Sequence, residues 1–358
     1  MIYFRIFTVS FLMKATEYII SPFKVSEDFL FAPKSFLVDS FVQAVEEIQL
    51  AKITTDQGSV NFLLSPNSLS KNKDAKSFFR RIKPVSNKVI ELSEKSVFID
   101  LRVNSPANVS HAIMIHLPIT ILVQKFFADE LLNKELVLIL PKNIPQHISE
   151  MFEALGYNYV ATNSPILGLQ IKFEASSWAV CRGELSSILR SGIRSDNFIN
   201  KIQSLSKKTA KKLFISRKSG RVLKNESEIE GVLTSLGYQK IYMEEYSILE
   251  QVAMVSHADS IVAIHGAALG LLSFRAVFNL PPIQLLELFP ASHMTNVYRV
   301  LAHQLGGKWT GVRGKLSKEI IEFLYDAKPG DIRKYSQSDF EICKESLLMA
   351  LGKLEQTG

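Results

Sequence analysis

The sequence predicts an α/β protein with two domains that each contain a parallel sheet. In the second half, short apolar runs alternate with capped helical segments of about ten to twelve residues, the pattern of strands joined by crossover helices. A similar alternation over residues 135–160 predicts a parallel layer in the first half. The length of 358 residues exceeds the usual size of a single core, which also favours two domains.

The composition is that of a globular chain with enough apolar residues for a large core. Hydrophobic residues make up 47% of the chain and charged residues 22%. The cysteines Cys181 and Cys343 lie far apart in no metal-ligand spacing, which argues against a disulfide framework or a zinc site. This cysteine usage fits a reducing cytoplasm. The net charge of +7 predicts an anionic partner, which could be nucleic acid, an anionic membrane surface or a phosphorylated small molecule.

The amino-terminal residues 1–18 are apolar, but their longest uncharged run, residues 6–13, is too short to span a bilayer. No small-residue cleavage pattern follows this run, which disfavours a signal peptide. We expect a first buried strand or an edge segment here, with peripheral membrane contact left open.

The first half contains a series of predicted elements around one long apolar helix. Turn residues at 104–108 precede this helix, which Pro118 is expected to kink. The other predicted elements are strands at 60–64, 97–101, 135–140 and 157–160, a polar loop at 67–77, a helix at 145–155 ended by Gly156, and an interdomain region with its flanking elements at 163–194.

The second half has a more regular pattern. Predicted strands occupy residues 213–215, 240–242, 260–264 and 282–289, with a helix at 294–305. Three further helices are expected to begin at capping boxes, formed by Asn225 with Glu228, Ser247 with Glu250, and Ser338 with Glu341. The last of them covers residues 338–355, is amphipathic, and is predicted to cross back onto the first domain.

Polar residues follow three of these strands, and the carboxyl ends of parallel strands form the usual ligand-binding edge. They are Ser216 and Arg217, His265 and Gly266, and Glu287. Residues 260–274, SIVAIHGAALGLLSF, are an apolar strand that breaks at small residues and enters a helix. The backbone N–H groups at such a helix start favour a bound phosphate.

Several other phosphate or metal sites are excluded by the sequence. It has no GxxxxGK[ST] loop, no GxGxxG after a predicted strand, no Asp-x-Asp pair and no HExxH motif. The charge of a phosphate leaving group would then be balanced by Arg217, nearby cations and backbone N–H groups. This describes metal-independent sugar transfer from a nucleoside diphosphate sugar, with no cofactor.

Three segments resemble the carboxyl-terminal half of glycosyltransferase family 61. They are LFISRKSGRVLKNESEIEGVLTSLGY, SILEQVAMVSHADSIVAIHGAALG and LLELFP, and the spacing of Asn108, His111 and Pro118 resembles the family's Asn-x-x-His-Trp motif. The resemblance implies a GT-B architecture of two Rossmann-like domains, and inverting, metal-independent transfer from a UDP-sugar to a polysaccharide or lipid-linked glycan. The expected divisions are an acceptor-side domain at 1–195, a nucleotide-sugar domain at 205–335 and a terminal helix at 336–358.

The resemblance also suggests roles for individual residues. His111 is the first candidate for the general base, because a histidine pKa of ~6.5 suits proton transfer near neutral pH, and His116 is a rival. The donor diphosphate is expected to bind Arg217, Arg221 and the backbone of Gly266, Ala267, Ala268 and Leu269, with His265 as a further ligand and Glu287 accepting from ribose hydroxyls.

The chain departs from the family pattern at several positions, which keeps a second function open. Ala112 replaces the motif's Trp, Ile115 stands where an acidic residue is usual, and Ala268 replaces a Gly of the turn. Gly270 and Leu271 replace a Thr-Asn pair. The alternative is a sugar-nucleotide-binding subunit without catalysis. Nucleic-acid binding is a third reading, but the chain lacks an RRM motif and zinc-finger spacing.

Overall fold

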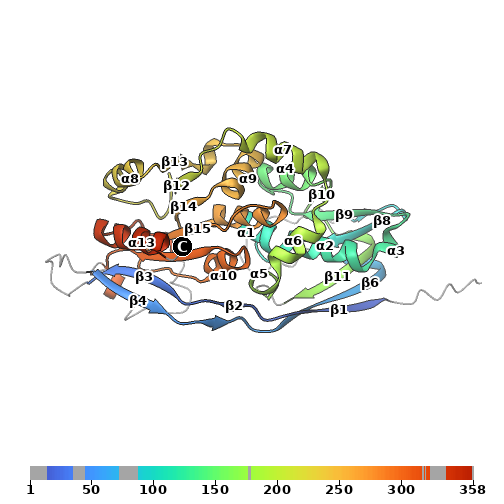
Figure 1. Ribbon diagram of the computed structural model, residues 1–358. Helices are drawn as coiled ribbons and strands as arrows, with labels where there is room; N and C mark the ends of the chain where they lie inside the picture. The colour runs from blue at the N-terminus through green and yellow to red at the C-terminus, as the bar shows by residue number, and fades with distance from the viewer. Residues whose placement is uncertain are drawn as a thin grey trace, which may run out of the picture.

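The computed structural model describes residues 14–34, 45–71, 88–175, 179–316, 318, 320–322 and 336–356. It contains two seven-stranded sheets and a two-stranded ribbon. The two large sheets lie side by side, and β1, paired with the long strand β6, forms an edge of the first sheet (Figure 1). The mixed α/β class predicted from the sequence is confirmed. The predicted amino-terminal segment at residues 1–13 lies outside the described residues.

The first sheet combines parallel and antiparallel strands. Its path is β1-β6-β11-β8-β9-β10, with the short β7 paired to β11. β8, β9 and β10 are parallel neighbours, whereas β6 is antiparallel to both β1 and β11. The strands are β1 (Ala15–Ile20), β6 (Gly58–Ser70), β7 (Ile90–Glu91), β8 (Ser96–Asp100), β9 (Glu135–Leu140), β10 (Asn158–Ala161) and β11 (Ile166–Ala175).

Two segments of the first half contain more regular structure than expected. The region 163–194, predicted as an interdomain region with its flanking elements, contains β11 and the helices α5 (Ala179–Gly183) and α6 (Leu185–Gly192). β11 lies between β6 and β8, and its Ile171 is completely buried. Gly168, next to a register shift between β11 and β6, interrupts the apolar alternation that would mark a strand. The predicted polar loop at 67–77 is also strand as far as Ser70.

The second sheet has the order β13-β12-β14-β15-β16-β3-β4. Six strands run parallel, and β4 is antiparallel to β3. The strands are β3 (Asp28–Pro33), β4 (Val45–Leu50), β12 (Lys212–Ser216), β13 (Gln239–Tyr242), β14 (Ser260–Ile264), β15 (Gln284–Phe289) and β16 (Lys308–Arg313), and β2 (Lys24–Val25) pairs with β5 (Ile53–Thr54) as a separate ribbon. Two amino-terminal strands therefore complete the sheet of the second half. The GT-B arrangement and the boundary between residues 195 and 205 stay predictions.

The helices of the second half begin where polar residues can cap them, although one predicted cap is absent. α9 (Ile248–His257) has the predicted capping box of Ser247 and Glu250. α8 (Glu226–Ser235) follows Asn225 as expected, but the Asn225 amide donates to Glu228 and to the Ile342 carbonyl instead of capping the backbone. The second half also contains α7 (Asp196–Ser206), η3 (Met243–Glu245), η4 (Ala267–Val277) and α10 (Val297–Gln304). Two short helices of the first half are α3 (Ala128–Leu131) and α4 (Gln146–Ala154).

The terminal helix α13 spans Lys344–Gln356 and starts later than predicted, so Ser338 and Glu341 do not cap it. Its apolar stripe, including Leu347 and Leu351, belongs to one buried cluster with Phe31 and Val312. It therefore packs on the second sheet, against β3, β4, β15 and β16 (Figure 1). β3 and β4 come from residues of the predicted first domain, but both are strands of the second sheet.

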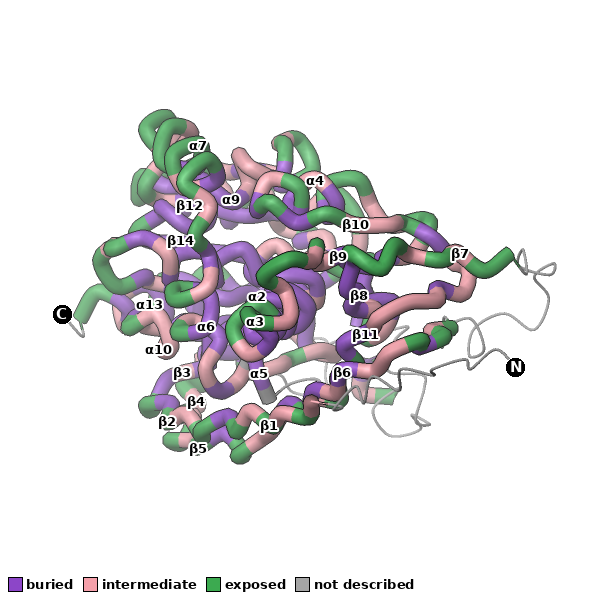
Figure 2. The backbone as a smooth tube through the Cα atoms, turned by 90° about the vertical axis from the view of Figure 1, so that its right-hand side faces the viewer, coloured by how far each residue is buried: buried purple, intermediate pink, exposed green. Residues whose placement is uncertain are grey.

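A long buried helix runs through the centre of the molecule beside the first sheet (Figure 2). It consists of α1 (Val109–His111), a π-helical turn η2 (Ala112–His116) and α2 (Leu117–Phe126). The change to π spacing comes directly before Pro118, which has no N–H for the normal α-helical bond. By length and composition, Val109–Phe126 could cross a membrane, but 72% of it is buried inside the structure, as in the core helix of a globular protein.

Candidate functional site

The carboxyl ends of β12 and β14 bring three of the predicted donor-site residues together. The guanidinium of Arg217, which follows β12, donates to the carbonyl of His265, which follows β14, at 3.4 Å. Arg221 donates to the same carbonyl oxygen at 2.8 Å. The predicted convergence of strand ends is therefore present for these three residues.

Arg221 is held in an unusual backbone conformation. Its φ is +58°, in the left-handed region that non-glycine residues rarely adopt, and it follows Gly220, with a φ of +57°. The Arg221 N–H donates to the Gln337 carbonyl at 2.9 Å, and its Nε donates to the Ser336 carbonyl at 2.5 Å. Such strain persists only where surrounding contacts enforce it, and it concentrates at functional sites.

The two guanidinium groups lie together without a carboxylate partner among the residues that the structure describes. The nearest acidic residues of the β13 end, Glu244 and Glu245, interact instead with Lys218. Burial lowers the pKa of Arg217. Burial, followed by the charge of Arg217, lowers the pKa of Arg221 to about 10. A bound anion would relieve this repulsion between two cations.

Gly266 allows Arg217 to approach the backbone closely. A Cβ at Gly266 would lie 2.6 Å from Nη1 of Arg217, so a larger residue would displace the guanidinium. The helix η4 starts at the next residue, with 3₁₀ hydrogen bonding. The first N–H groups of a helix have no partner within it, which leaves Ala267 and Ala268 suited to a phosphate.

Leu269, unlike Ala267 and Ala268, does not offer an N–H group to a phosphate. Its N–H already donates to the Gly266 carbonyl at 3.1 Å, and its side chain is buried. The predicted donor contact of Leu269 is therefore not supported by the geometry, because the one polar group that it could offer is occupied.

Glu287 lies below the site instead of facing it. Its side chain is completely buried, one oxygen contacts Nδ1 of His265, and the other accepts from Nε1 of Trp309 at 2.9 Å. The predicted contact with a ribose hydroxyl is thus corrected, because both carboxylate oxygens are used inside the protein. Glu287 orients the ring of His265.

The His265 ring also packs against the rings of His293 and Tyr298, two residues that the sequence analysis did not single out. The rings of His293 and Tyr298 lie 5.3 and 5.4 Å from the His265 ring, centroid to centroid. Burial, followed by the charges of Arg221 and His265, lowers the pKa of His293 to about 4. His293 follows β15, so the rule that identified the other strand ends could also have identified it.

His111 lies at the start of the central helix, with a defined tautomer. The side chain of Asn108 accepts from the backbone N–H groups of Ser110 and His111, which caps α1. Nδ1 of His111 lies 2.8 Å from the carbonyl oxygen of Asn104. A carbonyl oxygen only accepts hydrogen bonds, so Nδ1 carries the proton and Nε2 carries the lone pair of the neutral ring.

The residue before His111 connects this helix to the donor-site turn. A Cβ at Gly270 would lie 2.9 Å from Cα of Ser110, so only glycine permits the close approach of α1 and η4. Tyr298 donates to the Ser110 hydroxyl at 3.1 Å and also contacts the His265 ring. The candidate base and the donor site are therefore connected by packed residues.

His116, the rival candidate, is a core residue with 1% exposure. Its Nε2 lies 2.9 Å from the Val103 carbonyl, and its Nδ1 has no hydrogen-bond partner. Burial lowers its pKa to about 4. This position is that of a packing residue, and a side chain so enclosed cannot reach an acceptor hydroxyl without rearrangement.

A cavity of about 500 Å³ opens beside the start of η4. Val109 and Ala268 line it together with His147 of α4 and Gln251 of α9. It therefore reaches both the helix that carries His111 and the turn that carries Gly266. Among the described residues, no group of three or more His, Cys, Asp or Glu side chains is placed to hold a metal ion.

The comparison with protein families agrees with this site. Residues 109–275 match the family model described as Glycosyltransferase 61, and this range includes the central helix, both arginines and the His265 turn. The match supports glycosyl transfer as the activity of the protein. It also confirms the resemblance to glycosyltransferase family 61 that the sequence predicted.

Among solved structures, the chain is similar to two of the dodecameric, iron-containing transferase TibC. One is described as a heptosyltransferase in complex with ADP-D-beta-D-heptose, with a TM-score of 0.38 and 11% identity over 95% of this chain and 93% of that chain. The other, from enterotoxigenic E. coli H10407, has a TM-score of 0.37 and 10% identity over the same shares. No curated protein sequence matches the chain.

Proposed function

We propose that the protein transfers a sugar, with inversion and without a metal ion, from a UDP-sugar to a glycan or lipid-linked glycan. The observation that carries this proposal is the convergence of Arg217 and Arg221 on the His265 carbonyl beside a helix start. Two guanidinium groups and free backbone N–H groups are all hydrogen-bond donors, and a diphosphate presents only acceptors. The site is thus suited to a diphosphate leaving group.

The donor's charge would be balanced by protein groups alone. As the bond between the anomeric carbon and the diphosphate oxygen breaks, negative charge grows on that oxygen. Fixed cations and N–H dipoles stabilise such charge without reorganising during the reaction. Arg217 and Arg221 supply the cations, and Ala267 and Ala268 supply the N–H groups.

His111 is the proposed general base. In the inverting step, the acceptor oxygen forms a bond to the anomeric carbon on the face opposite the diphosphate, while its proton passes to Nε2 of His111. The Asn104 carbonyl supports this role, since it keeps the proton of the neutral ring on Nδ1. The resulting imidazolium could donate to the same carbonyl without moving.

The cavity beside Ala268 is the proposed binding site for the nucleotide-sugar donor. Its volume of about 500 Å³ is in the usual range for small-ligand sites. The diphosphate would lie at the η4 start, and the nucleoside would extend toward Gln251 and Tyr246, which line the same cavity.

A thermal-shift screen tests the donor class. The full chain is heated with UDP, ADP, GDP and their glucose conjugates, each with and without EDTA. We expect UDP and UDP-sugars to raise the melting temperature equally in both conditions, because a ligand that binds the folded state stabilises it. Stabilisation by none of these nucleotides, or stabilisation that EDTA abolishes, would contradict the proposal.

A further inference from the structure

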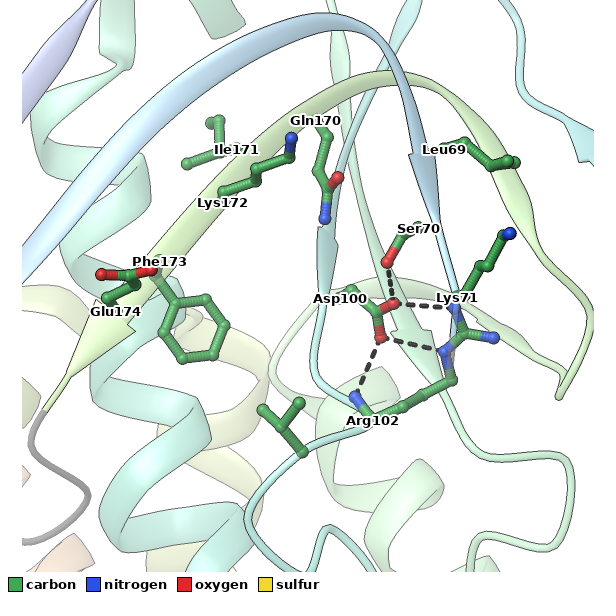
Figure 3. A pocket seen from close by; sticks show the side chains of 11 residues that line it. Leu69, Ser70, Lys71, Asp100, Arg102, Gln170, Ile171, Lys172, Phe173 and Glu174 are labelled. Carbon is green, nitrogen blue, oxygen red and sulfur yellow. Dashed lines mark hydrogen bonds and ion pairs between the residues drawn. The ribbon is translucent and has the colours of Figure 1, made fainter. Parts of the chain in front are cut away.

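A second cavity, of about 580 Å³, lies on the first sheet and has no role in the donor site. It opens at the carboxyl end of β8, where that strand stops while its neighbour β11 continues (Figure 3). Its lining contains both charged and aromatic side chains. Such a mixture is typical of a binding site and unusual for a packing defect, which is generally apolar.

The floor of this cavity holds a fixed carboxylate. Nε and Nη2 of Arg102 donate to the two oxygens of Asp100 at 2.9 and 2.7 Å, and Ser70 donates to the same group. Arg102 is 1% exposed, and its Nη1 donates to the carbonyls of Thr162 and Ser164. Asp100 is thus held in one orientation, with neutralised charge and acceptor lone pairs (Figure 3).

The opposite wall presents a fixed amide donor. The Ser68 hydroxyl donates to Oε1 of Gln170 at 2.6 Å, and both residues are buried. This bond directs Nε2 of Gln170 into the cavity, toward the space between Lys172 and Asp100 (Figure 3). Within the described part of the chain, this Nε2 group donates to no protein acceptor.

The remaining walls suit a sugar ring. Phe173 provides an apolar surface, while Lys172 and Glu174 stand exposed at the rim with opposite charges. A sugar has an apolar C–H face and hydroxyl groups that both donate and accept. An aromatic ring, a neutralised carboxylate and an amide N–H together match these features.

The cavity also adjoins the segment that holds the candidate base. Val103 lines it, and the next residue, Asn104, supplies the carbonyl that holds His111. We propose that this cavity binds the terminal sugar of the acceptor glycan, an inference that rests on the proposed transferase function. The acceptor hydroxyl would then approach His111 from the side opposite the donor turn.

Saturation-transfer NMR with methyl glycosides of glucose, galactose and xylose tests this site directly. The variants are Gln170→Met, which removes the amide donor, and Lys172→Met, which removes the charge of an exposed residue at the rim. Gln239→Met is the matched control, since Gln239 is exposed at the amino end of β13. The UDP-induced shift in melting temperature is recorded for every variant.

We expect at least one glycoside to bind the wild-type chain and to bind Gln170→Met about tenfold more weakly, a change of about 1.4 kcal/mol. Gln239→Met should bind it normally, and the UDP shift should be the same in all proteins. The inference is overturned if no glycoside binds, or if the cavity variants bind as well as the control. Glycoside binding that depends on Gln170 without any UDP binding would instead refute the proposed donor and leave this site standing.

Discussion

Arg217 and Arg221 donate to one acceptor, the carbonyl oxygen of His265, from 3.4 and 2.8 Å. Two cations converge on a single neutral oxygen, and neither forms an ion pair with a carboxylate in the described part of the chain. Such an arrangement is electrostatically unfavourable until an anion binds. This relationship is the basis of the account of donor binding.

Gly266→Ala should weaken UDP binding without unfolding the protein. The added Cβ would lie 2.6 Å from Nη1 of Arg217 and push the guanidinium away, whereas the extended φ of −175° suits alanine. Isothermal titration should show UDP affinity reduced by about tenfold or more, as for a lost charge-assisted contact.

Gly231→Ala is the matched control for that substitution. Gly231 lies within α8, where a Cβ would meet nothing within 4 Å. The change should leave UDP affinity unaltered and stabilise the helix by about 1 kcal/mol. If Gly266→Ala behaves like this control, Arg217 is not positioned by the close approach described above.

His111→Ala should abolish turnover and leave UDP binding unchanged. The loss of a general base typically costs about 10²–10⁴ in rate, while the donor contacts of the arginines remain. Turnover is measured as UDP release in the presence of acceptor, and binding by calorimetry. An active variant with a lowered melting temperature would show that His111 only caps and packs.

Glu287 should act through His265. Glu287→Gln keeps the shape but leaves one oxygen able to accept, so Nδ1 of His265 either loses its acceptor or must become an acceptor itself, in the other tautomer of the ring. We expect a lower kcat with nearly unchanged melting temperature. Glu287→Leu removes both bonds and should destabilise the fold by about 3–5 kcal/mol, as for other broken buried polar pairs. Normal kcat in Glu287→Gln would contradict the positioning role.

Stability should fall as the pH drops below about 6.5. The pKa values of His116 and His293 are lowered from 6.5 to about 4 in the folded protein, chiefly by burial. Between these values the unfolded chain binds protons that the folded chain does not, so the free energy of unfolding decreases with decreasing pH. Melting curves recorded across this range should show the decline.

The contribution of His116 can be isolated by substitution. His116→Leu should make the decline shallower, since a residue of similar size then occupies the core without titrating. An unchanged pH slope in His116→Leu would show that His116 does not contribute to it.

The sequence was sufficient to predict four strands of the second sheet, β12, β13, β14 and β15, because parallel buried strands are continuous apolar runs that end at polar residues. It did not reveal that β3 joins this sheet, since pairing between residues 29–31 and 310–312 is a long-range contact with no local signal. β11 was missed because Gly168 and polar residues break its alternation.

For the candidate site, strand position indicated Arg217 and the His265 turn, whereas Arg221 and His111 were suggested by the family resemblance. The burial of Glu287 could not be predicted, because it depends on a hydrogen bond from Trp309, which lies on the adjacent strand β16. The cavity lined by Asp100 and Gln170 could not be predicted from the sequence either, because its walls come from three strands that are distant along the chain.

Calorimetric titration of UDP in the presence of EDTA, with the wild-type chain and Arg217→Ala, shows whether Arg217 binds the donor without a metal ion. We expect saturable binding to the wild type without metal, and a loss of affinity of about tenfold or more in Arg217→Ala. Equal affinity in both proteins, or wild-type binding that requires a divalent cation, would refute the proposed donor site.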